Sequence, residues 1–528
     1  MYYSPKVKLS QMLCGLAVSL ALATPSLADI VNLKSSDGTV NLSGDLISFD
    51  GDIYIIRTDL GDLRIAANRV TCSGEGCPAT AAVTADVTIT GSDTIGEGLM
   101  PLLMQGYATY LDASVETKTT AVDGQLAATF TGEQGFGDPL GTYLVSATAS
   151  GDAFVSLLDG TSQLGMSTRR ITPDEARALR DAGGGNMIDP TQEHILAVDS
   201  LVVIVNRQNP VSELTVDNLA KIYAGEITNW SQLGGPDLPV VAATVAEDSG
   251  IFSVFRESVF TSGTPSMPAS IKHVGDNDEA AAFVNDNPGG IAFVGYAFQR
   301  GQKPLTIVSQ CGIGTTPDAF SVKTEEYALF RRLYLYNRAD LDNEMAKKFL
   351  EFTTSPEANA VIQQAGFVDL GIESQDLGLS NPRAARLTAD AAAARAYEAG
   401  VIESLLAMMD NAKRLSATFR FRTGSSKLDP RGELDLEQLA TYLSSMPAGT
   451  EVTFVGFSDE VGEFEPNLRL SKNRADQVAQ ALTAIAGDRL ANITIKTVGF
   501  GETSAASCNN SELGRSINRR VETWITNG

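Results

Sequence analysis

"VTITGSDTIGEGLMPLLMQGYATYL", residues 87–111, contains a short apolar strand, then a loop of glycine and hydroxyl residues, then a helical stretch. From residue 84 to 370, further strands such as "GGIAFVGYAF" and "RRLYLYNR" alternate with helical stretches such as "NEMAKKFLEFTTSPEANAVIQQAG". This alternation predicts a mainly parallel α/β architecture for the region. The Gly-rich segment 121–144 has no assigned place in the pattern.

The segments on either side of this region follow other patterns. Residues 29–80 alternate apolar and polar positions between turn dipeptides, which predicts a small β module of hairpins. Residues 371–415 are rich in alanine and helix formers, which predicts a helical linker. Residues 416–528 follow the order β-α-β-α-β and then add a helix and a strand. We therefore predict a multidomain chain.

Residues 1–28 have the features of a secretory signal peptide. Lys6 and Lys8 precede an apolar run over 12–23, and small residues precede a cut after Ala28. A retained anchor helix is the alternative, although the run is short for a membrane span. Cys14 lies inside the apolar run, so we do not expect lipidation. No later stretch approaches about 18 continuous apolar residues, and we expect an exported, soluble mature chain.

The cysteines left after this cleavage fit an exported protein. Cys72 and Cys77 close the tight loop "CSGEGC", where an oxidising compartment favours a disulfide. Their spacing does not match a zinc half-site. Cys311 and Cys508 can pair or stay free, and the sequence does not decide between the two.

Charge and residue inventory exclude several classes of function. Loss of residues 1–28 removes two lysines and no acids, which changes the formal net charge from −24 to −26. This acidity argues against a nucleic acid partner. His194 and His273 have no ligand-type neighbours at useful spacing, and no Ser-His-Asp arrangement is present. We therefore expect no catalytic residue, no metal, no cofactor and no enzyme activity.

Three loops of the α/β region pair small hydroxyl residues with the start of a helix. They contain Ser92 and Thr94, Ser150 and Gly151, and Ser249 and Gly250. Helix N-termini offer unpaired N–H groups and the positive end of a dipole to an anion. Taken singly, each loop is better explained as an ordinary helix cap, because serine and threonine are preferred there.

Residues 87–370 resemble the PstS-like substrate-binding proteins of phosphate ABC transporters. The motifs that carry the resemblance are "ITGSDTI", "LLDGTSQLGMSTRRIT", "LTVDNLAKIYAGEITNWSQLGG", "AAAFVNDNPGGIAFVGY" and "LFRRLYLYNR". The resemblance implies a two-lobed, type II periplasmic binding fold that closes on phosphate, and an ABC transporter permease as a partner. The anion ligands that it implies are Ser92, Thr94, Ser150, Gly151, Ser167, Thr168, Arg169, Ser249 and Gly250.

The third loop departs from the family pattern of an arginine, three residues and Ser-Gly-Thr. Val245 stands at the arginine position and Ile251 at the threonine position. A buried phosphate is costly unless its charge and lone pairs are met, so a lost guanidinium matters. Arg169 or Arg170 is the candidate replacement. Three alternatives stay open: phosphate, another small anion, or a domain that no longer binds a ligand.

The C-terminal segment places polar residues around one corner. Asn467, Ser471 and Arg474 follow Pro466 at positions i, i+4 and i+7, hence on one helix face, and Asp459 follows the strand 451–457. A carboxylate and a guanidinium that meet there can hold the ammonium and carboxylate of a zwitterion. An ordinary surface salt bridge is the alternative.

Residues 418–526 resemble an OmpA-like peptidoglycan-binding domain. The motifs are "FRTGSSKLDPRGELDLEQLATYL", "VGFSDEVG", "NLRLSKNRADQVAQAL", "IKTVGFGE" and "ELGRSINRRVETWI". The resemblance implies that Asp459 and Arg474 hold the diaminopimelate of the peptide stem, with Arg519 in a supporting role, and Ser458 replaces the usual threonine.

Together the two resemblances predict a phosphate or small-anion binding protein anchored non-covalently to peptidoglycan. The expected location is the periplasm of a Gram-negative bacterium, at the cell wall and outer membrane. The alternative is a structural cell-envelope protein whose middle domain binds no ligand and serves protein contacts.

Overall fold

The computed structural model describes residues 30–526 except 36–40, 50–52, 60, 75, 78–82, 134–136, 246–249, 261–266, 422–427 and 429. It divides into two compact units, residues 1–82 and 83–528. The expected signal peptide 1–28 and the candidate ligand Ser249 lie outside the described residues. Among the described helices, none is both long and apolar enough for a membrane span.

The first unit is an antiparallel sheet of five strands in the order β4-β3-β2-β1-β5. The strands are β1 (Ile30–Ser35), β2 (Asn41–Phe49), β3 (Ile53–Thr58), β4 (Gly61–Ala66) and β5 (Val70–Ser73). Alternate side chains of β1 and β3 form its small core. A disulfide joins Cys72 to Cys77. The predicted β module and its disulfide are both confirmed.

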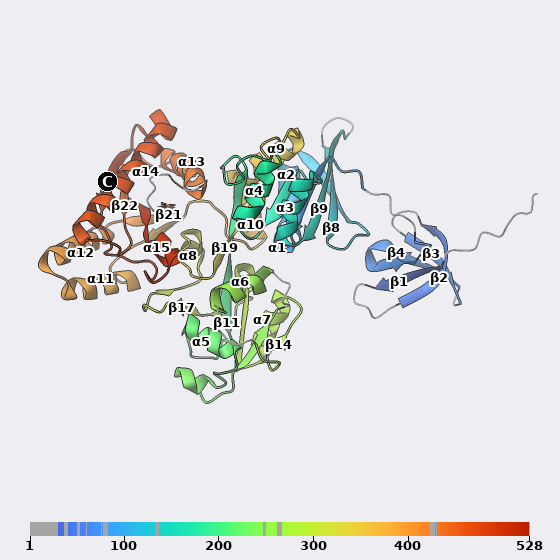
Figure 1. Cartoon of the computed structure of the whole chain (residues 1–528), viewed down its shortest axis with the longest axis horizontal. Coiled ribbons are helices and arrows are strands. Elements are labelled where there is room, and N and C mark those ends of the chain that lie inside the picture. Colours follow the sequence, from blue (N-terminus) through green and yellow to red (C-terminus); the bar gives the residue numbers. More distant parts are fainter. Residues whose placement is uncertain are drawn as a thin grey trace, which may run out of the picture. The chain divides into compact units, whose positions relative to one another are not determined.

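The second unit begins with one large mixed sheet that runs through two lobes (Figure 1). Its strands are β6 (Val87–Ser92), β7 (Ala113–Thr119), β8 (Gln125–Gly132), β9 (Pro139–Thr148), β10 (Leu164–Ser167), β11 (Glu193–Val205), β13 (Val241–Thr244), β14 (Lys272–His273), β15 (Gly290–Gly295), β16 (Lys303–Pro304) and β19 (Phe330–Tyr336). The Gly-rich segment 121–144 forms most of the β8–β9 hairpin.

The long strand β11 connects the lobes. Its first half pairs with β19 and its second half pairs with β15 and β16. The first lobe packs β6–β10 and β19 against α1 (Asp93–Gly96), α2 (Met100–Tyr110), α9 (Glu344–Thr353) and α10 (Pro356–Gln364). In the same lobe α3 (Ser150–Asp159) lies on β6 and β10, and α4 (Pro173–Asp181) lies against α3. The second lobe packs β13–β16 against α5 (Val216–Tyr223), α6 (Gly250–Val259) and α7 (Asn277–Asp286). The predicted two-lobed α/β fold is confirmed. The expectation of a mainly parallel sheet is wrong, because hairpins such as β7–β8 and the long crossing strand β11 pair antiparallel with their neighbours.

The C-terminal domain is a sheet in the order β20-β21-β24-β22-β23. The strands are β20 (Ser374–Asp376), β21 (Lys413–Arg420), β22 (Glu451–Gly456), β23 (Thr494–Gly499) and β24 (Arg520–Thr526). α13 (Pro430–Ser444) and α14 (Phe464–Ala486) pack on one face of the sheet. α15 (Glu512–Asn518) precedes β24. The order of strands and helices agrees with the pattern read from residues 416–528.

Two helices occupy most of the segment expected to be a helical linker. They are α11 (Pro382–Ala393) and α12 (Ala396–Met409). Their apolar residues form a core with Val455, Phe457 and Trp524. Because successive strand residues face opposite sides, Val452 and Phe454 of β22 enter the other core, beneath α13 and α14. The segment therefore forms the second covering layer of the C-terminal sheet.

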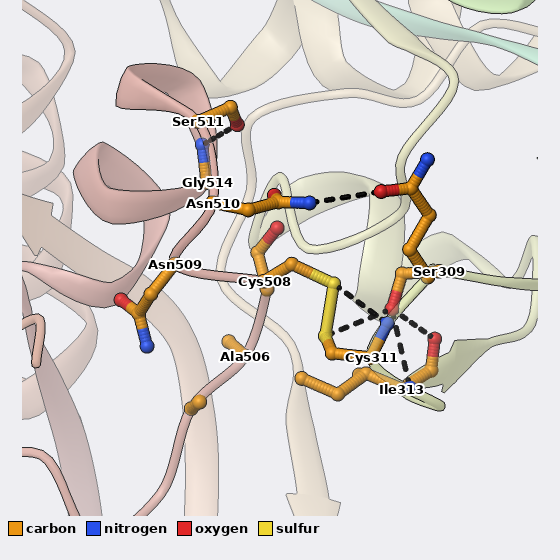
Figure 2. Close-up of a disulfide and its surroundings, with 12 residues drawn as sticks. Ser309, Cys311, Ile313, Ala506, Cys508, Asn509, Asn510, Ser511 and Gly514 are labelled. Carbon is orange, nitrogen blue, oxygen red and sulfur yellow. Dashed lines mark hydrogen bonds between the residues drawn. A yellow bond between two sulfur atoms is a disulfide. The ribbon is translucent and has the colours of Figure 1, made fainter.

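A disulfide joins the second lobe to the C-terminal domain (Figure 2). Cys311 lies between β17 (Thr306–Val308) and β18 (Gly314–Thr315), and Cys508 lies in the loop before α15. The S–S distance is 2.06 Å and the bond spans 197 residues of sequence. Beside it, Asn510 Nδ2 donates to Gln310 Oε1 at 2.9 Å. The open question about these two cysteines is thus resolved as a pair.

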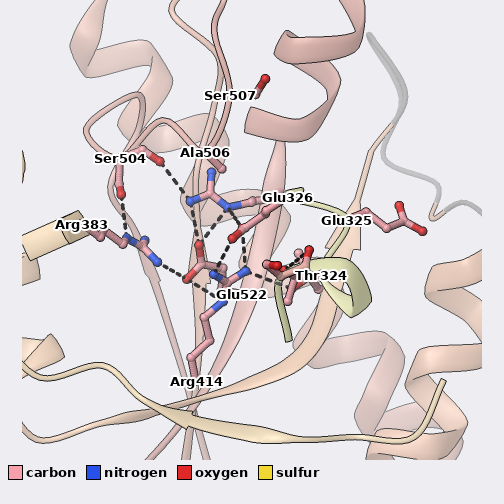
Figure 3. A network of polar contacts seen from close by, with 12 residues as sticks. Thr324, Glu325, Glu326, Arg383, Arg414, Ser504, Ala506, Ser507 and Glu522 are labelled. Atoms are coloured by element: carbon pink, nitrogen blue, oxygen red, sulfur yellow. Dashed lines mark hydrogen bonds and ion pairs between the residues drawn. The ribbon is translucent and has the colours of Figure 1, made fainter. Parts of the chain in front are cut away.

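Buried ion pairs form a second connection between these domains (Figure 3). Glu325 and Glu326 follow α8 (Ala319–Lys323). Arg414 donates to Glu326 at 2.7 and 3.0 Å, and Arg420 pairs with Glu325 at 3.1 Å. Glu325 adopts a φ of 54°, a backbone conformation that glutamate rarely takes. Burial alone would raise the pKa of Glu325, but Arg332, Arg420 and neighbouring arginines lower it to about 2.

This connection should weaken in acid. The folded-state pKa of Glu325 lies below its ordinary value of 4.5, so its stabilising contribution is complete above pH 4.5 and is lost as pH falls toward 2. We expect the urea midpoint of the intact chain to fall steeply over that range. Glu325→Gln removes the carboxylate that the largely buried Arg332 and Arg420 share and should cost about 3 kcal/mol at pH 7 while reducing the acid dependence. An identical acid dependence in the variant and the unaltered chain would refute this assignment.

Candidate functional site

Three adjacent parallel strands end at one edge of the first lobe. In the register, Ser92 at the end of β6 lies opposite Thr148 of β9, and Gly91 lies opposite Met166 of β10. Ser92 and Ser167 are both buried. Ligands of open α/β sheets bind outside the carboxyl ends of such strands. The structure therefore brings the first and second predicted loops to one edge.

The second loop is held by hydroxyl contacts. Ser150 Oγ lies 3.2 Å from Thr168 Oγ1 and accepts from the Thr168 N–H at 3.1 Å. Ser167 Oγ donates to the carbonyl of Arg169 at 2.7 Å. Ser150 begins α3, and a side chain added at Gly151 would come within 3.7 Å of the Arg169 guanidinium. A helix N-terminus and an arginine thus meet at this loop.

Both arginines proposed as replacements have carboxylate partners. Arg169 donates to Glu175 at 2.7 and 2.9 Å and lies over the ring of Phe154. Arg170 donates to Glu193 at 2.7 and 2.8 Å. Burial would raise the pKa of Glu175, but the bonds from Arg169 and Thr172 lower it to about 2. These pairs reduce the charge that either arginine offers to an anion.

A different arginine, Arg331 of β19, reaches the first loop. Its side chain is buried and donates to Asp199 at 2.8 and 3.0 Å and to Thr94 Oγ1 at 3.4 Å. Its Nη1 atom makes no hydrogen bond within the part of the chain that the structure describes. Sequence reasoning missed Arg331, although an arginine inside the apolar strand "RRLYLYNR" is itself unusual.

A cavity of about 300 Å³ lies in the cleft beside Thr94. Residues of both lobes line it, and the carboxylates among them are Asp93, Glu97, Asp199 and Asp276. Burial and then the nearby Asp93 and Asp123 raise the pKa of Glu97. Protonated or hydrogen-bonding ligands suit such a cleft better than a ligand that is fully ionised.

The third loop contributes apolar surface to the cleft. Val245 and Ile251 are both buried, and both line the cavity. Gly250 begins α6. The two departures from the family pattern therefore lie at the cleft itself.

The residues predicted for the wall site meet at one buried corner of the C-terminal domain. Asn467 and Ser471 lie on α14, which begins two residues before Pro466, and both are buried. Asn467 donates to the Asp459 carbonyl at 3.4 Å and to Glu502 at 2.9 Å. Ser471 accepts from the Gly501 N–H at 2.9 Å. These two residues fix the loops around the corner.

Charged groups complete the corner. Arg519 donates to Asp459 at 2.8 Å and to Glu512 at 2.6 Å, which assigns it a clear electrostatic partner. Burial would lower the pKa of Arg519, but these two carboxylates raise it. Sequence reasoning missed Glu502 and Glu512, which are ordinary surface residue types with no distinctive spacing.

Arg474 is buried, and no carboxylate of the described residues is hydrogen-bonded to it. Its guanidinium lies over the ring of Phe421 at 5.4 Å, and its Nε and Nη1 atoms make no hydrogen bond among the described residues. Burial and the neighbouring Arg519 lower the pKa of Arg474, and Asp459 opposes them. Two donors on this buried cation thus have no partner among the described residues.

Comparison with known proteins identifies both domains. A PBP superfamily domain matches residues 78–357, and the OmpA family matches residues 420–519. Phosphate-binding protein PstS of Staphylococcus haemolyticus is 27% identical over 239 residues, which is 44% of this chain and 72% of that protein. Outer membrane porin F of Pseudomonas fluorescens is 36% identical over 112 residues, 21% of this chain and 33% of the porin.

Solved structures show two further likenesses. An ABC-type phosphate transport receptor from Vibrio cholerae superposes with a TM-score of 0.41 at 23% identity, over 53% of this chain and 99% of the receptor. The peptidoglycan-associated lipoprotein from Burkholderia pseudomallei superposes with a TM-score of 0.19 at 28% identity, over 21% of this chain and 90% of the lipoprotein. Because the first family model spans more than half of the sequence, this chain belongs to the PBP superfamily, resembles PstS within it, and carries an OmpA family domain toward its C-terminus.

Proposed function

We propose that this protein binds phosphate or a related small oxyanion in the cleft of its PBP superfamily domain and is held to peptidoglycan by its OmpA family domain. The observation that carries the first part is Arg331. It places a buried cation at Thr94, where the third loop offers Val245 and Ile251 instead of an arginine and a threonine. Like Arg169 and Arg170, Arg331 shares its charge with a carboxylate, here Asp199. Its Nη1 donor makes no hydrogen bond among the described residues, and we infer that this donor meets the oxyanion.

The chemistry of the cleft favours phosphate over sulfate. Carboxylates line the cavity beside Thr94. A carboxylate accepts a hydrogen bond from a protonated oxyanion, and it repels one that has no proton to donate. Phosphate keeps a proton near neutral pH, whereas sulfate does not. The PstS relatives, named as phosphate-binding proteins, support the same choice.

The wall attachment rests on Asp459 and Arg474. Asp459 supplies a carboxylate for the ammonium of diaminopimelate, and Arg474 supplies two unbonded donors for its carboxylate. Asn467, Ser471 and Arg519 hold the loops and the acid in place. The role of this domain is binding without catalysis, in the periplasm at the cell wall, and an ABC transporter permease is the proposed partner of the receptor domain.

A structural envelope protein is the second candidate. Val245 and Ile251 make part of the cleft apolar, and the covalent link from the second lobe to the C-terminal domain suits a scaffold. A scaffold would not respond to small anions. Anion binding by the intact protein therefore separates the two functions.

Titration calorimetry of the mature chain tests the receptor function. We expect phosphate to bind, sulfate to bind far more weakly, and millimolar phosphate to raise the melting temperature, since it binds the folded state. Thr94→Val should weaken phosphate binding about 10- to 100-fold, the effect of one lost hydrogen bond to a charged group. Thr441→Val, an exposed threonine on α13, is the matched control. If no anion gives a binding signal in the calorimeter, the receptor function is refuted and the structural envelope protein becomes the better account.

A further inference from the structure

Strand β19 presents two different faces to two different sites. Arg331 points to the cleft, where it meets Asp199 and Thr94. Because successive residues of a strand face opposite sides, Phe330, Arg332 and Tyr334 point the other way. All three of these side chains line a second cavity, of about 530 Å³. One strand is thus shared between the anion cleft and this cavity.

The opposite wall of the second cavity belongs to the C-terminal domain. It includes Phe421, Ser516 and Arg519. Arg519 also donates a hydrogen bond to Asp459, and the guanidinium of Arg474 lies over the ring of Phe421. Two residues of the cavity wall therefore contact the corner that we assign to diaminopimelate.

Ion pairs at the cavity and a disulfide elsewhere between the domains join the two walls. Glu325 lines the cavity and accepts from Arg332 at 2.6 and 2.8 Å and from Arg420 at 3.1 Å, which joins the two domains at one edge. The Cys311–Cys508 disulfide holds the second lobe to the loop before α15. The juxtaposition is thus built by a covalent bond and by buried ion pairs.

The charge of the lining selects the kind of ligand. Four arginines and two glutamates line the cavity. Each arginine shares its charge with a carboxylate: Arg332 and Arg420 with Glu325, Arg170 with Glu193, and Arg519 with Asp459 and Glu512. Arg519 keeps an unbonded Nε atom among the described residues. Aromatic and apolar side chains complete the wall, and pockets of this size accept small ligands. A short peptide that ends in a carboxylate fits this combination.

We propose that the cavity is the second half of the peptidoglycan site and accepts the peptide stem beyond its diaminopimelate. Phe330 and Tyr334 would pack on the stem, while the arginines receive its terminal carboxylate. The solute-binding domain then takes part directly in wall recognition. This inference rests on the proposed wall attachment and extends it across the domain boundary.

The test compares two probes on the intact mature chain: free meso-diaminopimelate and a soluble disaccharide-tetrapeptide that contains it. The unaltered protein should bind the muropeptide more tightly than the free amino acid. Phe330→Ala, on the solute-binding wall, and Ser516→Trp, which fills the cavity from the opposite wall, should each weaken muropeptide binding about tenfold, as for an interface anchor, and leave diaminopimelate binding unchanged. Ser404→Trp, an exposed helix serine with a similar backbone hydrogen bond, is the matched control.

The outcomes separate this inference from the function beneath it. Selective loss of muropeptide binding in both variants supports the composite site. Unchanged muropeptide binding in both variants, or equal loss of both probes, overturns it while the corner at Arg474 keeps its role. If the unaltered chain binds neither probe, the wall attachment itself is refuted together with the inference.

Discussion

Arg474→Ala should abolish co-sedimentation of the protein with diaminopimelate-type peptidoglycan and leave the fold intact. Most buried arginines form an ion pair with a carboxylate, and removing the arginine leaves that carboxylate buried without a partner. Among the described residues Arg474 has no hydrogen-bonded carboxylate, and burial together with Arg519 lowers its pKa, so its charge is a cost to the folded state. Its removal should therefore leave the melting temperature unchanged or raise it. The variant thus separates binding from folding.

The control for this variant lies on the same helix. Arg469 of α14 is exposed and pairs with Glu465, so Arg469→Ala should pellet like the unaltered chain. Arg474→Lys keeps the charge without the planar fork and should retain weak binding. Asp459→Ala should also lose binding, but it removes one of the two carboxylates bonded to Arg519 and should lower stability as well. Normal pelleting of both Arg474→Ala and Asp459→Ala would refute the site.

The element types could be predicted from the sequence because periodicity and turn residues are local properties. The strands of 87–92 and 330–336 and the helix pair 344–364 follow from such patterns. The corner of Asn467, Ser471 and Arg474 was also predictable, since helical spacing fixes which residues share a face. In each of these cases the residues that determine the structure lie within one strand or about two turns of one helix.

The remaining features depend on distant contacts. Arg331 reaches Thr94 across a separation of 237 residues, and no local pattern says which face of β19 meets the cleft. The composition of residues 382–409 is typical of a helical linker. That these helices cover the second face of the C-terminal sheet is visible only in the folded structure. The Cys311–Cys508 bond joins two domains, and cysteine spacing does not specify such a pair. Tertiary geometry decides all three.

Removing the Cys311–Cys508 disulfide should uncouple the unfolding of the two domains. The bond closes a sequence separation of 197 residues, for which the chain-entropy model gives about 5 kcal/mol of stabilisation. In the intact chain we expect both domains to unfold in one transition. In the double variant Cys311→Ser/Cys508→Ser the remaining connection is non-covalent and includes the buried ion pairs of Glu325 and Glu326, and two transitions should appear.

The chain carries its own probes for this experiment. Its two tryptophans are Trp230, buried in the second lobe, and Trp524, buried in the C-terminal domain. Trp524→Phe leaves fluorescence from the second lobe, and Trp230→Phe leaves fluorescence from the C-terminal domain. Urea midpoints from the two versions should coincide with the disulfide present and separate without it. Cys72→Ser/Cys77→Ser, which opens a separation of 5 residues in the other unit, should change neither midpoint. Coincident midpoints in the Cys311→Ser/Cys508→Ser background would show that the ion pairs alone couple the domains.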